Sequence, residues 1–578
     1  MGRQVAIGAQ DFASLIENNY FYIDKSSFIK DWWNNGDTVT LITRPRRFGK
    51  TITMNMLDYF FSNKYAGRGD LFDGLDIWKD EKFRKLQGTY PVIFLTFAGV
   101  KQTTYRDTIS TINDRIASLY NQYDSLIKDD MFSDADRELF YSVKKDMDET
   151  TAGLSLNHLC EWLYRFYGKK CIILLDEYDT PLQEAYIGGF WKELTSYIRA
   201  LFNNTFKTNP SMERAIMTGI TRVSKESIFS DLNNLTVVTT TSDKYATDFG
   251  FTEEEVFRAV EEQGHGEDIK EQVKLWYDGF TFGIHKDIYN PWSITYFLDT
   301  GKFDTYWANT SGNGLVGHLI QNGEPDIKME FEKLISGECI EAVIDEQIIF
   351  NQLDTDKDAV WSLLLASGYL KCDSIIQERP EETAIYRLVL TNFEVKKMFQ
   401  KMVRGWFNKD SSYNEFVKAM FKGDLRSMNH YMNKVVLNTF SYFCQACREC
   451  AGDTFSVDAG KKPSEESEPE KFYHGFVLGL LVDNAKNYVV KSNRESGFGR
   501  YDVVMEPKDK NDVAVIIEFK VYDKEYDGEN DLSDTADNAL KQIEEKQYAA
   551  DLLAQGVSED KILKYGFAFQ GKKCLIKK

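Results

Sequence analysis

The 578-residue sequence has no apolar run that approaches the roughly 18 consecutive residues needed to cross a lipid bilayer. Residues 1–11 also lack a positively charged stretch followed by an apolar core, so we expect no secretory signal. The eight cysteines are scattered along a long chain, which favours reduced thiols over a disulfide framework. These absences predict a cytoplasmic location and no membrane partner.

Positive charge is also in short supply, with 70 lysines and arginines against 90 aspartates and glutamates and a net charge of −20. A broad nucleic-acid-binding surface needs clustered basic residues, so the composition argues against such a surface but leaves room for a local basic cleft. Hydrophobic residues make up 43% of the chain and aromatic residues 14%, which indicates folded domains throughout. The length exceeds a single hydrophobic core and predicts about two to four domains.

A phosphate-binding loop is indicated by Arg-Pro-Arg-Arg-Phe-Gly-Lys-Thr at 44–51, between an expected strand at 39–43 and a helical pattern. In such a loop the backbone N–H groups hold phosphates, the lysine reaches the terminal phosphates, and the hydroxyl meets Mg²⁺. These roles fall to Gly49, Lys50 and Thr51. The first glycine of the usual motif would fall at position 44, which is arginine, so a basic turn before a surface helix stays open on this motif alone.

A second element lies downstream, where the apolar run 171–175 is followed by Asp176, Glu177, Tyr178 and Asp179. A carboxylate at the end of a buried parallel strand can hold the Mg²⁺ shell, and the next carboxylate can orient or deprotonate the attacking water. We assign these roles to Asp176 and Glu177. A buried strand that ends in a solvated acidic turn is the alternative, but the preceding Gly-Lys-Thr loop favours an NTPase.

Strand-like and helical patterns alternate in the N-terminal part, which predicts an α/β domain with a mainly parallel sheet. The expected strands are 39–43, 92–97, 171–175 and 213–220, and the expected helices are 51–61, 106–120, 154–167 and 190–206. A polar residue at the tip of a strand beside the acidic strand can contact the γ-phosphate or its attacking water. Thr218 and Arg222 lie at such a tip, although a surface salt bridge is an equal alternative for Arg222.

A second constellation lies near the C-terminal end. Asp502, near the head of one expected strand, lies 16 residues before Glu518, and Lys520 follows two residues later in the next strand. Residues two apart in a strand face the same side, so Glu518 and Lys520 can share a pocket with Asp502. Two carboxylates can hold one or two Mg²⁺ ions that activate a water, and the lysine can position or deprotonate that water. A lone Glu-x-Lys tripeptide is weak evidence for such a site, but the surrounding sequence strengthens this interpretation.

Three further residues are candidate accessories of this site. Glu470 and His474 lie four residues apart on an expected helix, so both can point toward one cleft, although helix packing is slightly favoured for His474. Gln542, on a later helix, is a candidate substrate-contacting or water-orienting residue, and an exposed polar position is the alternative.

These motifs make the chain resemble, over nearly its whole length, the bacterial predicted AAA-ATPase-like proteins that carry a C-terminal PD-(D/E)XK nuclease domain. The resemblance also rests on blocks at 11–12, 22–26, 175–179, 218–222, 276–280, 289–293 and 307–313. Proteins of this family look alike in having Arg-Pro-Arg-Arg-Phe-Gly-Lys-[Ser/Thr] as their own form of the loop, so Arg44 belongs to the motif.

The resemblance implies an ATPase domain followed by a metal-dependent nuclease domain. The candidate ATP-binding residues are Arg44, Arg46, Arg47, Phe48, Gly49, Lys50, Thr51, Asp176 and Arg222. The candidate metal ligands are Thr51, Asp176, Asp502 and Glu518, and the candidate catalytic residues are Glu177, Asp502, Glu518 and Lys520.

The middle of the chain is expected to be helical and winged-helix-like, with a helix and glycine turn at 361–370 and a strand at 386–390. Such modules often act as spacers in ATPases of this kind, so we favour that role over DNA binding. The blocks at 276–280, 289–293 and 307–313 place turn signals beside large aromatic residues, which indicates core or interdomain packing.

Cys444, Cys447 and Cys450 form a C-x₂-C-x₂-C run that could begin a zinc or iron–sulfur site. No fourth ligand is evident in the sequence, so buried or incidental thiols are favoured. Residues 453–470 are rich in glycine, serine, lysine and glutamate and contain two prolines, a composition typical of a linker.

We therefore expect a P-loop AAA-like ATPase domain (1–245), a helical lid and winged-helix-like region (246–452), a linker (453–470) and a PD-(D/E)XK nuclease-like α/β domain (471–578). The expected function is ATP binding and hydrolysis coupled to Mg²⁺-dependent cleavage of nucleic acid, with DNA favoured, in defence or mobile-element control. ATP and Mg²⁺ are the expected cofactors, and a homo-oligomer is a possible assembly. Two alternatives stay open: a nucleotide-switched sensing protein whose C-terminal domain binds nucleic acid or a partner without cutting, and an ATP-driven motor that uses this domain as a clamp.

Overall fold

The structure is a computed structural model. It describes the whole chain except residues 1, 223–227, 230–231, 309–312, 323–324, 346–352, 354–355, 378, 380–382, 408–411, 440–476, 478–487, 497–498, 523–528 and 571–572. The expected linker and the residues Cys444, Cys447, Cys450, Glu470 and His474 lie outside the described residues.

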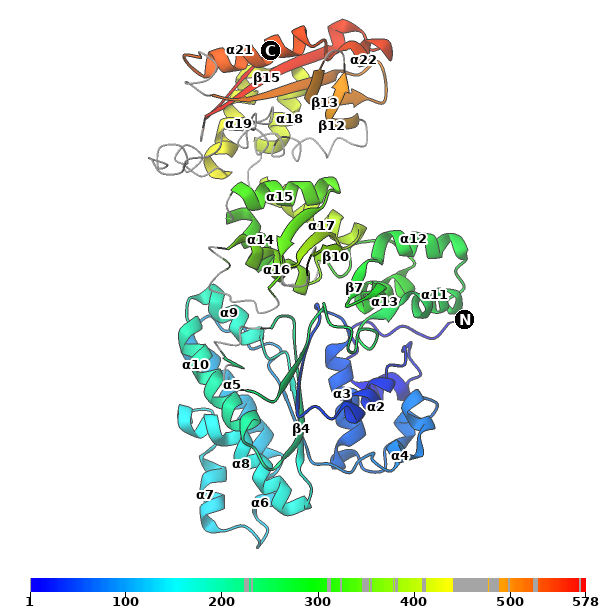
Figure 1. The fold of residues 1–578 in the computed structure, drawn as a ribbon, viewed down its shortest axis with the longest axis vertical. Helices are drawn as coiled ribbons and strands as arrows, with labels where there is room; N and C mark the ends of the chain where they lie inside the picture. The colour runs from blue at the N-terminus through cyan, green and yellow to red at the C-terminus, as the bar shows by residue number, and fades with distance from the viewer. Residues whose placement is uncertain are drawn as a thin grey trace. The chain divides into compact units, whose positions relative to one another are not determined.

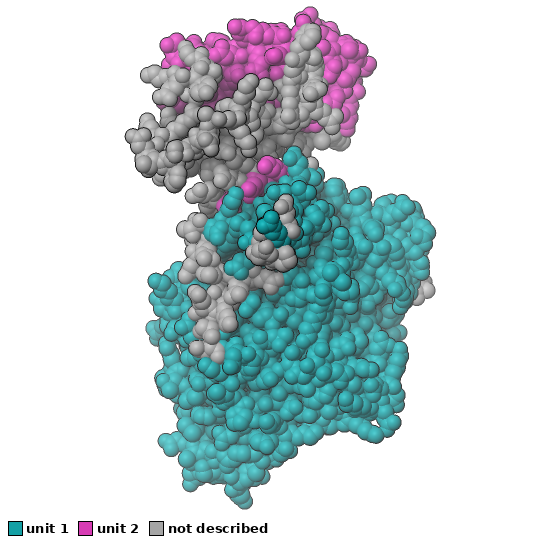
Figure 2. Space-filling view, viewed as in Figure 1, with its two compact units in different colours: residues 1–319, 337–398 teal, residues 320–336, 399–578 magenta. Residues whose placement is uncertain are grey.

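The chain divides into two compact units (Figure 2). Unit 1 comprises Met1–Leu319 and Gly337–Met398, and unit 2 comprises Ile320–Ser336 and Phe399–Lys578. Among the residues that the structure describes, no helix has both the length and the apolar character that a membrane crossing requires. The finer division of the chain into four parts stays a prediction.

Unit 1 is built on a five-stranded sheet in the order β2-β3-β4-β1-β5, and its neighbouring strands run parallel. The strands are β1 (Val39–Thr43), β2 (Val92–Thr96), β3 (Cys171–Asp176), β4 (Met212–Gly219) and β5 (Leu235–Val238). All residues of β1 and β3 are buried, as is typical of parallel strands covered on both faces. The sheet confirms the predicted α/β fold with a parallel sheet.

Helices cover both faces of this sheet (Figure 1). One face carries α2 (Ser27–Asn35) and α3 (Lys50–Phe61), whose apolar side chains share a core with residues of all five strands. The other face carries α5 (Tyr105–Asn121), α8 (Glu149–Tyr167) and α10 (Trp191–Phe202). The shorter helices of this part are α1 (Phe12–Glu17), α4 (Glu81–Arg84), α6 (Asp124–Ile127), α7 (Asp134–Ser142) and α9 (Thr180–Gly188).

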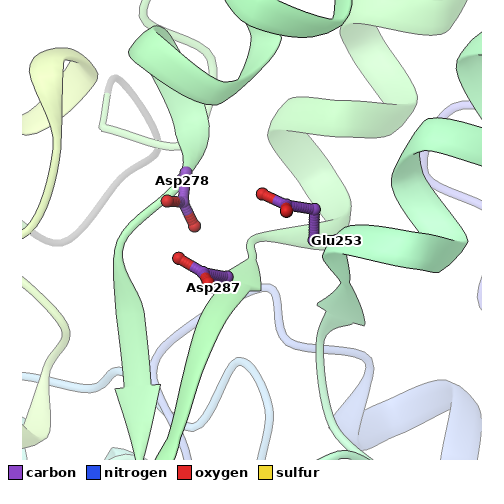
Figure 3. Close-up of side chains that lie close together, drawn as sticks. All are labelled: Glu253, Asp278 and Asp287. Atoms are coloured by element: carbon purple, nitrogen blue, oxygen red, sulfur yellow. The ribbon is translucent and has the colours of Figure 1, made fainter.

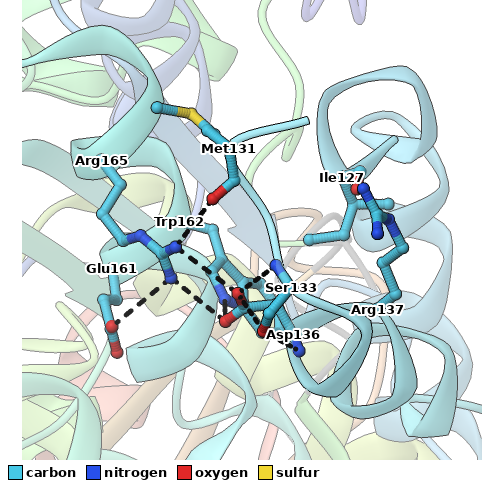
Figure 4. A network of polar contacts seen from close by, with 8 residues as sticks. All are labelled: Ile127, Met131, Ser133, Asp136, Arg137, Glu161, Trp162 and Arg165. Carbon is cyan, nitrogen blue, oxygen red and sulfur yellow. Dashed lines mark hydrogen bonds and ion pairs between the residues drawn. The ribbon is translucent and has the colours of Figure 1, made fainter. Parts of the chain in front are cut away.

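A polar network joins the N-terminus of α7 to the C-terminal half of α8 (Figure 4). Ser133 and Asp136 form a capping box at the start of α7. The Asp136 carboxylate also accepts hydrogen bonds from the indole N–H of Trp162 and the guanidinium of Arg165, both at 3.1 Å. Burial raises the pKa of Asp136, but these hydrogen bonds together outweigh burial and hold that pKa well below its usual range. The network fixes α7 against α8.

The rest of unit 1 contains two small antiparallel sheets. The first has the order β6-β8-β7, formed by β6 (Phe251–Thr252), β7 (Phe280–Phe282) and β8 (His285–Tyr289), and it accompanies α11 (Glu253–Glu262), α12 (Glu267–Tyr277) and α13 (Pro291–Thr300). The second has the order β10-β11-β9, formed by β9 (Ile340–Val343), β10 (Leu370–Ile376) and β11 (Ile385–Leu390). Helix α16 (Lys357–Ala366) precedes β10, and the winged-helix-like character of this region stays a prediction. Helices α14 (Asn313–Asn322) and α17 (Phe393–Phe407) each span a boundary between the units.

Unit 2 contains a mixed five-stranded sheet in the order β12-β13-β14-β15-β16, in which β14 and β15 run parallel and the other neighbours run antiparallel. The strands are β12 (Tyr488–Ser496), β13 (Gly499–Pro507), β14 (Ala514–Val521), β15 (Ile562–Gln570) and β16 (Lys573–Lys577). Its helices are α15 (Pro325–Ser336), α18 (Ser412–Lys422), α19 (Leu425–Thr439), α21 (Leu532–Glu545) and α22 (Ala550–Ala554). The mixed sheet with its helices confirms the predicted C-terminal α/β fold.

Two close contacts hold helices against this sheet. A Cβ atom added to Gly566 of β15 would lie 2.4 Å from the carbonyl oxygen of Ala536, so glycine permits α21 to approach the strand. On the edge strand β16, Asn429 and Asn433 of α19 exchange pairs of hydrogen bonds of 2.7–2.9 Å with the backbone of Ile576 and Cys574. The two asparagines cover an edge that would otherwise present unpaired backbone groups.

Candidate functional site

The predicted phosphate-binding loop connects the carboxyl end of β1 to the N-terminus of α3. Gly49 precedes the helix and has a left-handed backbone with a φ of 77°, and Arg47 has a φ of 66°. Because glycine has no side chain to cap the helix, the first N–H groups of α3 lack an N-cap acceptor from this residue. Such a helix start is suited to binding an anion.

Thr51 and Asp176 meet although they lie 125 residues apart in the sequence. The Thr51 hydroxyl donates a 2.8 Å hydrogen bond to Oδ2 of Asp176, and the Thr218 hydroxyl donates to Oδ1 at 2.5 Å. Asp176 is fully buried, and burial raises the pKa of its carboxyl while the Thr218 hydroxyl lowers it. Since β4 lies between β1 and β3 and runs parallel to both, the three strands end at the same edge of the sheet and bring these side chains together.

The Lys50 side chain folds back onto its own loop. Its ammonium group donates hydrogen bonds to the carbonyl oxygens of Arg44 at 2.9 Å and Pro45 at 2.8 Å. Burial lowers the pKa of Lys50 to about 8, although Glu177, Asp179 and Asp176 act in the opposite direction. An anion placed beside this ammonium group would favour its charged form.

Glu177 has a left-handed backbone with a φ of 52°, which is unusual for a residue with a side chain. Its carboxylate accepts a 3.2 Å hydrogen bond from the Thr180 hydroxyl, and its backbone N–H donates to Thr218 Oγ1 at 3.3 Å. Such strained positions are found where surrounding structure fixes them, commonly at active sites. The backbone turn directs Glu177 into a cavity that the phosphate loop also lines.

Asp179 has a place in the site that we did not predict from the sequence. Its buried Oδ2 atom accepts the backbone N–H groups of Ile220 at 2.9 Å and Thr221 at 3.0 Å. The carboxylate therefore joins the end of β3 to the end of β4, and it also lines the cavity. The sequence feature that could have indicated this role is the position of Asp179, three residues after Asp176 and just before the helix start Thr180-Pro181.

The Arg44 side chain packs inside the domain. Its guanidinium is fully buried and donates to the backbone carbonyls of Thr43 at 3.0 Å, Thr239 at 2.5 Å and Tyr245 at 3.3 Å. It also lies 4.6 Å from the centre of the Phe282 ring. Among the described residues this side chain does not line the cavity, and the predicted contact of Arg44 with ATP stays a prediction.

The other arginines and Phe48 are divided between the cavity and its surroundings. Arg46 and Arg47 line the cavity, and the Arg46 guanidinium donates to Gln183 Oε1 at 3.1 Å. Phe48 also contributes to the wall and packs edge-on against Phe280, with ring centres 4.8 Å apart. Arg222 follows β4 and is not among the residues that line this cavity in the described part of the chain, so its phosphate contact stays a prediction.

The cavity has a volume of about 490 Å³ and lies within unit 1. Besides the loop and the acidic residues, its wall includes the N-terminal segment 6–10, residues 21–23 and part of α13. The block 289–293, which the sequence indicated only as packing, therefore reaches the candidate nucleotide site through Pro291 and Trp292.

The aromatic blocks also hold the phosphate loop in place. The carbonyl oxygen of Arg46 accepts hydrogen bonds from Asn290 Nδ2 at 3.2 Å and from the Trp307 indole N–H at 3.0 Å. Gly368, which has a φ of 84°, allows the turn after α16 to approach Pro45, since a Cβ atom there would lie 2.8 Å from the proline ring. The sequence indicated only core or interdomain packing for these blocks. The structure shows that they also pack directly against the phosphate loop.

Glu394 is hydrogen-bonded to the aromatic blocks that contact the phosphate loop. Its fully buried carboxylate accepts the Ser293 hydroxyl at 2.8 Å and the backbone N–H groups of Trp307 at 2.7 Å and Ala308 at 3.3 Å. Burial raises the pKa of Glu394 to about 7, although these hydrogen bonds oppose the shift. The usual value is 4.5. A proton therefore binds this carboxyl more tightly in the folded protein than in the unfolded chain.

The stability of unit 1 should fall with rising pH because of Glu394. Between its unfolded pKa near 4.5 and its folded pKa near 7, the folded state holds more protons than the unfolded state. The free energy of unfolding of the wild type, relative to Glu394→Gln, should decrease from pH 5 to pH 8 by up to about 1.4 kcal/mol per pH unit. Urea unfolding followed by tryptophan fluorescence would measure this difference, with Glu254→Gln at an exposed position as the control. A difference in the free energy of unfolding that is constant from pH 5 to pH 8 would contradict the raised pKa of Glu394.

In unit 2, Asp502 lies on β13 and Glu518 and Lys520 lie on the adjacent strand β14. The register pairs Val503 with Ile517, so Asp502 and Glu518 are the next residues along the two strands. Asp502 Oδ2 accepts the backbone N–H of Phe519 at 2.7 Å. The structure thus brings the three predicted nuclease residues to one region of neighbouring strands.

Gln542 joins this group from helix α21. Its side-chain amide donates to Glu518 Oε1 and, at 3.2 Å, to the Tyr548 hydroxyl. Glu518 is buried, with 3% of its surface exposed, and so the amide contact orients a carboxylate that has little access to bulk water. The alternative of an exposed polar position for Gln542 does not agree with this contact.

Another acidic cluster lies in unit 1, where Glu253, Asp278 and Asp287 place carboxylate oxygens within 4.8 Å of one another (Figure 3). Tyr289 donates a 3.1 Å hydrogen bond to Glu253, which also pairs with Lys274. Burial and then the charge of Asp287 raise the pKa of Asp278 to about 7.

Comparison with known proteins agrees with these two sites. Residues 6–229 match the family described as Predicted AAA-ATPase, and residues 468–578 match the PD-(D/E)XK nuclease superfamily. The protein is therefore of the class that combines a P-loop ATPase fold with a nuclease fold. In particular, residues 6–229 carry an AAA-ATPase-like domain and residues 468–578 carry a domain of the PD-(D/E)XK nuclease superfamily, as the resemblance implied.

A protein of Azotobacter chroococcum mcd 1 is similar to part of this chain. It is described as an uncharacterized protein in the vnfD 5' region and is 24% identical over 396 residues, which is 68% of each chain. Its description states no activity, so the argument for function depends on the two sites.

Proposed function

We propose that the protein binds and hydrolyses ATP in unit 1 and cleaves nucleic acid in its C-terminal domain, with a divalent metal ion at each site. The observation that carries the first part is the hydrogen bond between Thr51 and Asp176, made beside the buried Lys50. Side chains from the loop and the acidic strand thus form one site, although they are far apart in the sequence.

At the ATPase site, the backbone N–H groups at the start of α3 would hold the phosphates, and Lys50 would leave the loop carbonyls to reach them. The Thr51 hydroxyl and the Asp176 carboxylate are hard oxygen ligands and fit Mg²⁺. Bound Mg²⁺ would neutralise charge that develops on the phosphates. Glu177, which lines the same cavity, would orient or deprotonate the attacking water.

At the nuclease site, Asp502 and Glu518 are the oxygen ligands that fit Mg²⁺, and Gln542 orients Glu518. Mg²⁺ at this position would lower the pKa of a bound water and stabilise an in-line displacement at phosphorus. Lys520, two residues after Glu518 on the same strand, would position or deprotonate that water.

We further propose that ATP hydrolysis controls cleavage, because one chain carries both sites. DNA is the proposed substrate, and defence or mobile-element control in the cytoplasm is the proposed setting. The four-part division of the chain and a homo-oligomeric assembly belong to this proposal. Arg46, Arg47 and Arg222 are its candidate partners for phosphate charge, either within one chain or across an oligomer.

The test compares the purified full-length wild type with Asp502→Ala, Lys520→Ala and Lys50→Ala in cleavage of DNA with Mg²⁺ or Mn²⁺, with and without ATP. We expect the wild type to cut, Asp502→Ala and Lys520→Ala to lose cutting, and Lys50→Ala to lose its dependence on ATP. A wild type that cuts with neither metal, or an Asp502→Ala variant that still cuts, would contradict the nuclease proposal. Binding of DNA without cutting would favour the nucleotide-switched sensing protein, and DNA-stimulated ATP hydrolysis that survives loss of Lys520 would favour a motor.

A further inference from the structure

The cavity in unit 1 has a wall that a phosphate chain does not require. In addition to the phosphate loop and the acidic residues, it is lined by an apolar wall, which we define as Ala6, Ile7, Leu15, Phe21, Ile23 and Trp292. Phosphate oxygens bind to N–H groups and cations. An apolar and aromatic lining instead fits a flat, largely hydrophobic group. At about 490 Å³ the cavity also has the size of a site for a complete cofactor, which is about 300–1,000 Å³.

Trp292 is placed by the phosphate loop itself. Asn290 caps α13 by accepting the Trp292 backbone N–H at 2.9 Å, and its amide donates to the Arg46 carbonyl at 3.2 Å. The guanidinium carbon of Arg47 lies 4.1 Å from the centre of the indole ring. Trp292 is half-buried, and its ring centre lies 5.0 Å from that of Tyr296. One short chain of contacts therefore couples the aromatic ring to the residues expected to hold phosphates.

We propose that the apolar wall receives the nucleobase of the bound nucleotide and that Trp292 is the residue on which the base stacks. This inference rests on the proposed ATPase function and extends it by assigning the base subsite. Because every nucleobase has a π-face, Trp292 supplies affinity and not discrimination among bases. Arg47 belongs to the phosphate loop and contacts the indole, so it links the subsite for the base to the subsite for the phosphates.

The test compares two ligands that share a phosphate chain and differ in the base. Binding of ATP and of inorganic tripolyphosphate, each with Mg²⁺, is measured by calorimetry on the full-length wild type, Trp292→Ala, Trp292→Phe and Lys50→Ala. We expect Trp292→Ala to weaken ATP binding by about tenfold or more and to leave tripolyphosphate binding within about twofold, because only ATP carries a stacking base. Trp292→Phe should restore most of the ATP affinity, and Lys50→Ala should weaken both ligands.

A control and a second measurement separate stacking from folding. Trp276→Ala, at a half-buried tryptophan of α12 that is not among the cavity-lining residues, should change neither affinity. In the wild type, ATP should quench tryptophan fluorescence more than tripolyphosphate does, and Trp292→Phe should lose that difference. If Trp292→Ala weakens both ligands equally or neither, or if the fluorescence difference persists in Trp292→Phe, the base subsite is wrong while the ATPase proposal stands. If the wild type binds neither ligand, the ATPase proposal fails and the inference fails with it.

Discussion

Replacing Lys50 with alanine is expected to slow ATP hydrolysis by at least about a hundredfold, because removing one preorganised charge-stabilising group from a phosphoryl-transfer site has costs of this size. In the structure the Lys50 ammonium group is buried and donates hydrogen bonds to carbonyls of the phosphate loop. The charges of Glu177, Asp179 and Asp176 act to raise its pKa. It is the cation best placed to meet the terminal phosphates. The rate of phosphate release at saturating Mg²⁺ and ATP would measure the effect.

Lys85 provides the matched control for this experiment. Its side chain is 75% exposed and pairs with Glu81 on the surface, so Lys85→Ala should hydrolyse ATP at the wild-type rate. Circular dichroism would establish that both variants keep the fold. A Lys50→Ala rate within about threefold of the wild type would show that hydrolysis takes place without this side chain, contrary to the mechanism.

Glu518→Gln should reduce cleavage of nucleic acid by at least about a hundredfold and leave ATP hydrolysis within about twofold of the wild type, since a neutral amide cannot replace a carboxylate as a metal ligand. Glu518 is buried and its Oε1 atom accepts a hydrogen bond from Gln542, so the substitution keeps the shape of the site while removing the charge. Nicking of supercoiled DNA and phosphate release from ATP, measured on the same preparation, would give the two rates.

Glu544→Gln on α21 is the control for the nuclease variant. Its carboxylate is 65% exposed and pairs with Lys564, so this change should alter neither rate. Loss of both activities in Glu518→Gln would indicate a general structural defect. Unchanged cutting by a folded Glu518→Gln protein would exclude Glu518 as a metal ligand.

Much of the N-terminal sheet could be predicted because its strands are short apolar runs that end in chemically distinctive residues. The expected strand 39–43 has the bounds of β1. The expected strand 171–175 differs from β3 by one residue at one end, and the expected strand 213–220 differs from β4 by one residue at each end. The short strands β6, β7 and β8 carry no comparable signal. The pairing of β6 with β8 joins Phe251 to Tyr289, and local sequence patterns do not report such contacts.

In the candidate nucleotide site, likewise, local motifs predict some contacts, and others depend on segments that are far apart in the sequence. The closeness of Thr51 and Asp176 followed from two motifs placed at the ends of parallel strands. The packing of Arg44 could not be predicted, because the carbonyl groups that receive it belong to Thr239 and Tyr245, about 200 residues along the chain. The position of Trp292 in the cavity wall depends likewise on Asn290 and its contact with Arg46, which no local motif predicts.

The central claim is that the loop of residues 44–51, together with Asp176 and Glu177, holds the nucleotide, and a crystal structure with Mg²⁺ and a non-hydrolysable ATP analogue would test it most directly. The account predicts that the phosphates lie at the N-terminus of α3, with the Lys50 ammonium group moved from the carbonyls of Arg44 and Pro45 to the phosphate oxygens. It also predicts that Mg²⁺ lies between the Thr51 hydroxyl and Asp176. An analogue bound elsewhere in the protein, or Lys50 still hydrogen-bonded to the loop carbonyls beside a bound analogue, would contradict it.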